Sequence, residues 1–209
     1  MTCNTEDENA KNAFLSFVEN VEPELKKLGF ELNKKVVSSQ HIDSLDKDRF
    51  RVLVRDWCAD VEIFRDENVP LQTEDTKLGQ EYAELCGAMM VNFDGEERTM
   101  PQMGMYQQDQ DRSVREASWR AVAERRLQDR DAIDGIFDKM VANRNQTAQN
   151  AGFEEYRGYM FAVKHRFDYT PEDCIAFHDA IDEACMPIVR TLAKERKEAL
   201  GVDTLRPWD

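Results

Sequence analysis

Apolar residues recur every three or four positions through most of this 209-residue chain, and this spacing is the strongest constraint on its fold. In the segment 6–28, for example, Phe14, Phe17, Val21 and Leu25 fall on one face of a helix. Because an apolar stripe of this kind is stable only when it is buried against other elements, the sequence predicts an all-α, multi-helix fold.

Cap residues, glycines and prolines divide this pattern into separate predicted helices. Thr5 is the predicted cap of the first helix, which Pro23 should kink and Gly29 should end. Pro187 should bend the last helix. Long and short helices are expected over residues 6–28, 31–38, 50–64, 73–87, 100–107, 112–150, 153–159 and 171–200.

The periodicity changes at Met89. The segment MMVNFDGEERTM alternates around Asp94-Gly95, which is a strong signal for a two-residue turn. The sequence therefore predicts one small β-hairpin, at about residues 89–99. We divide the chain at the same point, into a helical region 1–88 and a second region 89–209.

Acidic residues outnumber basic ones by 42 to 28, which gives a formal net charge of -14. Such a surface repels phosphate backbones and anionic lipids. The arginines of segment 120–130 are interleaved with acids at helical spacing, which is typical of an ion-paired solvent face. No signal peptide and no membrane-spanning run is found. We therefore expect a cytoplasmic protein that binds neither nucleic acid nor membrane.

Three stretches carry a resemblance to a known family: NAGFEEYRGYMFAVKHRFDYTPED (150–173), VLVRDWCADVEIFRDENVPLQTEDTKL (52–78) and AFHDAIDEACMPIVRTLAKERKEALGVDTLRPWD (176–209). Together they resemble the oligoendopeptidase F branch of the thimet-oligopeptidase-like zinc metallopeptidases. The resemblance implies part of a two-lobed helical peptidase that cleaves short peptides in a deep channel with zinc on its floor. Residues 1–88 would be lid-like, and 89–209 would supply the hairpin and the first helices of the catalytic lobe.

The motif that holds zinc in this family is absent from the sequence. Two imidazoles must lie one helical turn apart, with a Glu between them to activate water, as in His-Glu-x-x-His. The three histidines, His41, His165 and His178, are not spaced in this way. We therefore expect no catalytic or zinc-binding residue here. The resemblance implies an inactive fragment, with zinc, the oligopeptide substrate and a missing catalytic segment as the cofactor and partners of the intact protein.

Aromatic and basic residues crowd the segment 156–169 and are the candidate site. The aromatic side chains could line a peptide groove or pack the junction between two helices. The basic residues could meet a substrate carboxylate or pair with neighbouring acids. The candidate residues are Tyr156, Tyr159, Lys164, His165, Arg166 and Tyr169.

A second pattern lies on the last predicted helix, where Cys174, His178 and Asp182 follow at four-residue intervals. Nucleophilic sites are usually assembled from separate segments, so we interpret this row as structural. The predicted buried stripe of this helix contains Cys174, Phe177, Ile181, Cys185, Ile188 and Leu192. All five cysteines of the chain are expected to be reduced thiols in the core.

Two functional hypotheses follow. The first is a fragment of a zinc-dependent metallo-oligopeptidase that forms part of the substrate-channel wall. The alternative is a free-standing acidic helical module that binds peptides or proteins without cleaving them.

Overall fold

The computed structural model describes residues 7–209 and divides into two compact units. Unit 1 contains residues 1–88 and 131–167, and unit 2 contains residues 89–130 and 168–209. The mostly helical fold with one small hairpin is the predicted one. The expected cap Thr5 lies outside the described residues. The assignment of 89–209 to a catalytic lobe stays a prediction.

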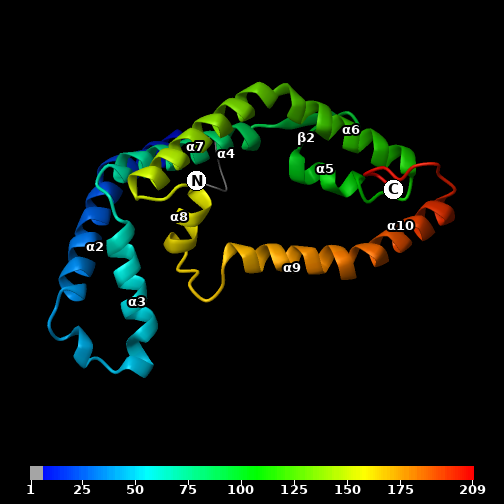
Figure 1. Cartoon of the computed structure of the whole chain (residues 1–209). Helices are drawn as coiled ribbons and strands as arrows, with labels where there is room; N and C mark the ends of the chain where they lie inside the picture. The colour runs from blue at the N-terminus through cyan, green and yellow to red at the C-terminus, as the bar shows by residue number, and fades with distance from the viewer. Residues whose placement is uncertain (1–6) are drawn as a thin grey trace. The chain divides into compact units, whose positions relative to one another are not determined.

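Unit 1 is helical throughout the part that the structure describes. Helices α2 and α3 lie side by side in it, as Figure 1 shows. Its elements are α1 (Glu8–Asn20), α2 (Glu22–Val37), the short 3-10 helix η1 (Ile42–Ser44), α3 (Lys47–Ile63), α4 (Asn68–Gly87), α7 (Arg130–Asn150) and α8 (Tyr156–Val163).

The first predicted helix is two helices, and the prediction that Gly29 ends it is wrong. The break falls at Val21, so that Pro23 lies in the first turn of α2, where a proline is tolerated. Helix α2 continues through Gly29 to Val37. Its Phe30 ring stacks on Phe64 with centroids 4.1 Å apart. Such packing offsets the cost of about 1 kcal/mol for a glycine inside a helix.

Helix α4 begins at Asn68, five residues before the predicted start at Thr73. Asn68 is buried, with 1% of its surface exposed. Its side-chain amide donates to the Thr147 carbonyl at 2.9 Å and accepts from the Asn150 amide at 2.9 Å. These two hydrogen bonds hold the start of α4 on α7. They join residues far apart in sequence, so a local capping pattern does not predict them.

The core of unit 1 is closed around the end of α7. Ala148, Ala151 and Tyr159 are buried there. Partly buried residues that pack against them are Ile63, Phe153, Tyr156, Met160 and Val163. Gly152 ends α7 with a φ of 86°, as predicted.

Unit 2 contains the hairpin and four helices among the described residues. They are β1 (Met90–Phe93), β2 (Glu96–Thr99), α5 (Met100–Tyr106), α6 (Arg112–Gln128), α9 (Pro171–Ala184) and α10 (Met186–Leu200). The predicted hairpin is confirmed. The strands pair antiparallel with Met90 opposite Thr99, and the two turn residues, Asp94 and Gly95, both have positive φ. This is the backbone that an Asp-Gly turn favours.

The two longest predicted helices are each interrupted. The expected helix 112–150 breaks at Asp129, which separates α6 from α7. No glycine or proline marks this break in the sequence. The last helix breaks at Cys185, so that Pro187 lies in the first turn of α10. Within residues 7–209, none of the helices combines the length and the apolar character that crossing a membrane requires.

Trp208 holds the segment that follows α10 against α6. Trp208 is 92% buried, and the centre of its ring lies 5.3 Å from that of Trp119. Arg115 donates to the Trp208 carbonyl at 2.7 Å, and Arg112 donates to the Asp209 carboxylate at 2.6 Å. The far end of α10 is thereby tied to the rest of unit 2.

Glycine substitutions test the backbone geometry. Gly29→Ala should raise the free energy of unfolding by about 0.5–1 kcal/mol, because the helix interior favours alanine and nothing lies within 4 Å of the new Cβ. Gly152→Ala should lower the free energy of unfolding, because a residue with a side chain is strained at the positive φ of this position. The strain comes from the backbone alone, since no atom lies within 4 Å of the added Cβ. Urea unfolding measures both. The same sign at the two positions would contradict these backbone assignments.

A second stability prediction concerns Asn68. Asn68→Ala should lower the free energy of unfolding by about 1–3 kcal/mol, because it removes the two hydrogen bonds of a buried side chain, one to the Thr147 carbonyl and one from the Asn150 amide. The exposed Asn145 on the same helix α7 offers a matched control, for which Asn145→Ala should stay within about 0.5 kcal/mol of wild type. Equal losses from the two variants would show that the buried amide does not hold α4 on α7.

Candidate functional site

Two adjoining cavities in unit 1, of about 280 and 320 Å³, form the candidate site. They share four lining residues, Lys26, Gln72, Tyr159 and Val163, so we treat them as one feature and call it the unit 1 groove. Helices α2, α3, α4, α7 and α8 supply its walls.

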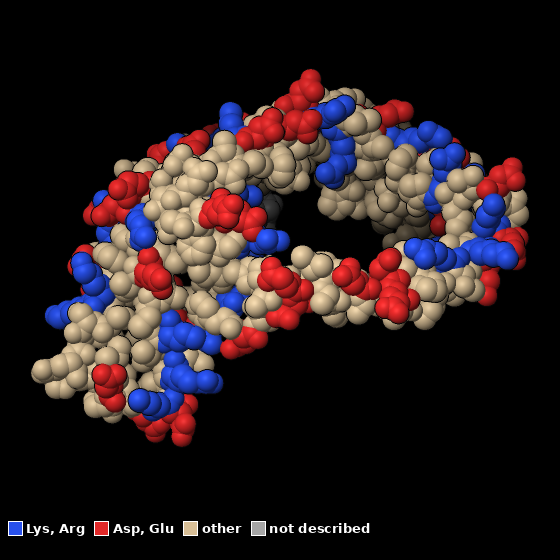
Figure 2. All heavy atoms as spheres, in the orientation of Figure 1, with Lys and Arg blue, Asp and Glu red and all other residues tan. Residues whose placement is uncertain are grey.

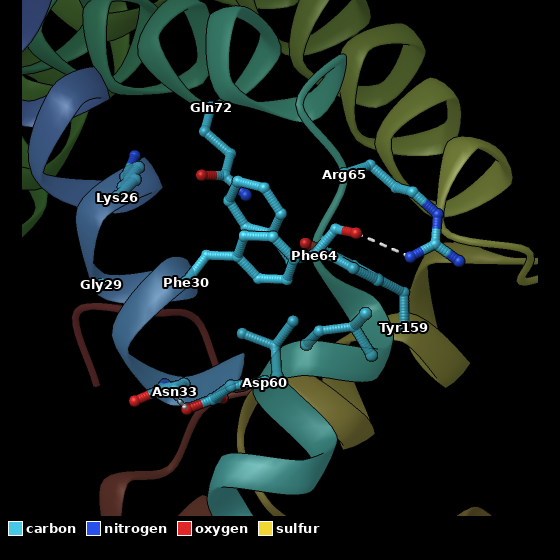
Figure 3. Close-up of a pocket in the computed structure, with 11 residues that line it drawn as sticks. Lys26, Gly29, Phe30, Asn33, Asp60, Phe64, Arg65, Gln72 and Tyr159 are labelled. Atoms are coloured by element: carbon cyan, nitrogen blue, oxygen red, sulfur yellow. Dashed lines mark hydrogen bonds between the residues drawn. The ribbon is translucent and has the colours of Figure 1, made fainter. Parts of the chain in front are cut away.

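The first cavity has an apolar wall and a polar rim (Figure 3). The rings of Phe30 and Phe64 are stacked, with an angle of 12° between their planes. Gly29 also lines the cavity, and a Cβ built there would meet no atom within 4 Å. Asp60 and Gln72 contribute polar groups. A cavity of this kind suits a large apolar side chain flanked by hydrogen-bonding groups.

Arg65 fixes the junction beside this cavity. It donates to the Phe64 carbonyl at 2.6 Å, drawn as a dashed line in Figure 3, and to the Glu62 carbonyl at 2.8 Å. A longer bond of 3.5 Å reaches the Ala151 carbonyl just beyond α7. The last carbonyl groups of a helix have no helical N–H partner. The Arg65 guanidinium therefore supplies hydrogen-bond donors to main-chain carbonyls at the end of α3.

The second cavity is built around an ion pair between α7 and α4. Arg144 donates to both carboxylate oxygens of Asp75, at 2.9 and 3.2 Å, and lies 5.8 Å from the centre of the Tyr156 ring. The hydrogen bond to Asp75 raises the pKa of the Arg144 guanidinium, and burial acts in the opposite direction. Asn143 adds a hydrogen bond of 2.7 Å to the Leu71 carbonyl. These contacts fix the cavity wall in one arrangement.

Tyr159 lies between the two cavities and is 95% buried. Burial raises the pKa of its phenol, and a hydrogen bond with the Gln72 side chain acts in the opposite direction. Burial also raises the pKa of the neighbouring Tyr156. Both phenols are therefore neutral at physiological pH and can exchange hydrogen bonds with a ligand's peptide groups.

The predicted site residues are brought together only in part. Tyr156 and Tyr159 line the groove, whereas Lys164, Arg166 and Tyr169 are exposed and do not line it. Arg166 instead lies 5.5 Å from the centre of the Phe161 ring. Contact of the six predicted residues with a substrate stays a prediction.

His165 contacts the groove through Asp60. Its Nε2 lies 2.8 Å from an Asp60 oxygen and its Nδ1 lies 3.6 Å from an Asp56 oxygen. Asp60 lines the first cavity. The alternative that the basic segment pairs with neighbouring acids therefore holds for His165, which has a φ of 52° at this tight bend.

Sequence reasoning missed the groove residues of the other helices. Phe30 lies on α2, Phe64 follows the last residue of α3, and Gln72 lies on α4. Arg144 pairs with Asp75 across 69 positions of sequence. Their apolar spacing is the same as that of an ordinary core. Only the three-dimensional packing distinguishes a cavity wall from a filled core.

The residues that the structure describes do not form a zinc centre. Within residues 7–209, no three His, Cys, Asp or Glu side chains gather in a way that could hold a metal ion. His165 has its two carboxylates on different ring nitrogens, so they cannot converge on one ion. His41 lies 3.4 Å from the Gln40 amide, and His178 lies on α9.

The prediction of a buried stripe on α9 and α10 is wrong for the described chain. Phe177 is 64% exposed, Ile188 61% and Leu192 59%. Cys58 and Cys185 are also exposed, whereas Cys86 and Cys174 are partly buried, so these four thiols do not lie in the core as expected. The helical period correctly identified an apolar face, but a period does not say what covers it.

The model of peptidase family M3 matches residues 105–209, which is half of the chain, and the chain therefore belongs to this family of peptidases. This confirms the resemblance inferred from the sequence. No curated protein matches the sequence.

Solved structures agree with the family assignment. The chain is 25% identical to a protein described as an oligoendopeptidase F from Bacillus anthracis str. Ames, with a TM-score of 0.91 over 99% of this chain and 38% of that one. It is 28% identical to PZ peptidase A, crystallised with an inhibitor, with a TM-score of 0.92 over 99% of this chain and 36% of that one. The chain thus spans less than two fifths of the length of these peptidases.

The raised pKa of Tyr159 predicts a pH dependence of stability. The folded state holds the phenolic proton more tightly than the unfolded state, so this contribution is complete below about pH 10 and is lost as the pH rises above it. Tyr159→Phe removes the titrating group and should reduce that loss. Urea unfolding at a series of pH values from about 9 to 11 measures it. An equally steep loss in both proteins would show that Tyr159 does not contribute.

Proposed function

We propose that the unit 1 groove binds an extended oligopeptide and that this chain forms part of the substrate-channel wall of a zinc-dependent metallo-oligopeptidase. The observation that carries the proposal is the groove itself, with its apolar cavity beside neutral phenols and amides. The membership of peptidase family M3 supports the choice of peptides as the ligand.

The charges of the groove favour a peptide without strong charge over an anionic or cationic ligand. Lys26 lies 3.0 Å from Glu22, Arg144 pairs with Asp75, and Asp60 contacts His165. Because each of these groups already has an internal partner, a ligand charge would have to displace one of them. A peptide backbone needs only the hydrogen bonds that Gln72, Tyr156 and Tyr159 can offer.

We propose a large apolar side chain as the group that enters the first cavity. Phe30, Phe64, Ile63 and Val163 provide apolar surface on its walls. Burial of such a side chain contributes about 1.5–3 kcal/mol, which is enough to set a preference among peptides. The residue at this position of the peptide would be aromatic or branched aliphatic.

Hydrolysis is assigned to a complex with a polypeptide that carries the His-Glu-x-x-His helix, and this chain alone is proposed to be inactive. Zinc, when bound by such a helix, lowers the pKa of a water molecule and polarises the scissile carbonyl. The residues described here would bind and orient the peptide. The cytoplasmic location expected from the sequence stays a prediction.

The alternative function, a binding module without catalysis, is favoured by one observation. All the residues that line the groove belong to unit 1. Peptide binding would then be the whole activity. Both functions require the groove, and they differ in whether a partner adds hydrolysis.

Peptide binding is tested with Gly29 variants. Gly29→Trp places a large ring in the first cavity and should weaken the binding of a fluorescein-labelled, phenylalanine-containing hexapeptide at least tenfold, or about 1.4 kcal/mol. Gly29→Ala is the matched control and should bind as wild type does. Fluorescence anisotropy measures both. Unchanged affinity in Gly29→Trp would show that the peptide does not use this cavity.

Hydrolysis is tested on the purified chain with an internally quenched peptide and added zinc. We expect no chelator-sensitive cleavage and no stoichiometric metal, because the chain lacks paired imidazoles. Metal content is measured by mass spectrometry. Cleavage that follows the bound zinc and stops with chelator, with contaminating proteases excluded, would overturn the assignment of catalysis to a separate polypeptide. It would leave the binding proposal intact.

A further inference from the structure

Gln72 and Tyr159 lie between the two cavities of the unit 1 groove. Of the four residues that line both cavities, Val163 is apolar and Lys26 is paired with Glu22 at 3.0 Å. Gln72 and Tyr159 are the other two, and both can donate and accept hydrogen bonds. The groups that they leave unpaired define the chemistry of an occupant.

The two side chains bond to each other. Gln72 extends from α4 toward the stacked rings of Phe30 and Phe64 in Figure 3, and its amide forms a hydrogen bond with the Tyr159 phenol. Burial raises the pKa of this phenol, whereas the hydrogen bond acts to lower it. A hydrogen bond lowers the pKa of an acid when it is donated to the acid's oxygen, so the Gln72 N–H donates and the phenol oxygen accepts.

This hydrogen bond leaves one donor and one acceptor free. The Gln72 Oε1 and the Tyr159 O–H have no further partner within the described residues. A hydrogen bond in the reverse direction would also leave one donor and one acceptor, so the count does not depend on which group donates. Tyr159 is 95% buried, and a polar group in such a position is costly when unpaired.

A free donor beside a free acceptor is complementary to one residue of an extended peptide. The N–H and the C=O of such a residue point to the same side, as they do in the hydrogen-bonded pairs of an antiparallel sheet. The N–H can donate to the Gln72 Oε1, and the C=O can accept from the Tyr159 O–H. A charged group or an apolar group would leave at least one of these two bonds unmade.

We propose that Gln72 and Tyr159 bind the N–H and the C=O of one residue of an extended peptide, and that they exclude proline and N-methylated residues from that position. We call the pair the main-chain clamp. The inference rests on the proposed function of the groove and adds a class of substrate to it. Proline lacks the N–H that the Gln72 Oε1 accepts. The residues before and after the bound one lie at the two cavities, because the clamp lines both.

The charges near the groove do not favour a different ligand. Acidic and basic side chains are interspersed over α2 and α3, which supply part of its wall (Figure 2). A surface on which both signs alternate produces no strong field that would attract a charged ligand. Selection by the groove then depends on neutral hydrogen bonds and on the shape of its cavities.

Ester substitution along the peptide tests the clamp. In a series of analogues of the fluorescein-labelled hexapeptide, one peptide N–H at a time is replaced by an ester oxygen, and fluorescence anisotropy measures each affinity. We expect wild type to bind one analogue at least tenfold more weakly than the parent peptide, because the Gln72 Oε1 then faces an oxygen instead of a donor. Gln72→Met should remove this difference between the two peptides. Tyr159→Phe should keep it, while binding the parent peptide about fivefold more weakly, because only the O–H is lost.

Gln149→Met is the matched control, because Gln149 is an exposed glutamine of α7 that does not line the groove. It should show the same difference between the two peptides as wild type. Each difference is a ratio of affinities within one variant, so it does not depend on how much of that variant folds.

Two results would overturn the clamp and leave the proposed function of the groove standing. One is a wild-type chain that binds the parent peptide and every ester analogue equally well, and the other is an unchanged difference in Gln72→Met. A wild-type chain that does not bind the parent peptide would instead contradict the proposed function itself, and the clamp with it.

Discussion

The buried amide of Asn68 is the interaction on which unit 1 depends. It joins the first residue of α4 to the last turn of α7, and the Asp75–Arg144 ion pair and the Asn143–Leu71 hydrogen bond continue the same contact line. Buried polar groups of this kind are costly when unpaired, so they specify one alignment of two helices. That alignment places Tyr156 and Tyr159 opposite α2 and α4 and so creates the groove.

Much of the fold could be predicted from the sequence because its signals are local. The Asp-Gly turn fixed the hairpin, and the helices expected from residues 100 and 171 begin there as α5 and α9, each preceded by a threonine that forms a capping box. The errors have a common cause. Gly29 stays helical through the Phe30–Phe64 contact, and α4 begins early through Asn68. Both depend on residues distant in sequence, which no local pattern reports.

The candidate site was predictable to a lesser degree. The concentration of aromatic residues in this segment singled out Tyr156 and Tyr159, and both line the groove. Arg144 and Asp75 gave no such signal, because each looks like a charged residue on the exposed face of its own helix. The exposure of Phe177 and Leu192 was also hidden, because the sequence pattern of a covered face and an uncovered one is the same.

The glycine at position 29 gives the groove an unusual capacity for change. A side chain added there enters open space from a helix that gains from losing a glycine, so neither steric clash nor backbone strain opposes it. Relatives could therefore acquire narrower or differently shaped cavities through a single nucleotide replacement in one codon. The peptide preference proposed for the groove would change in this way while the surrounding scaffold stayed the same.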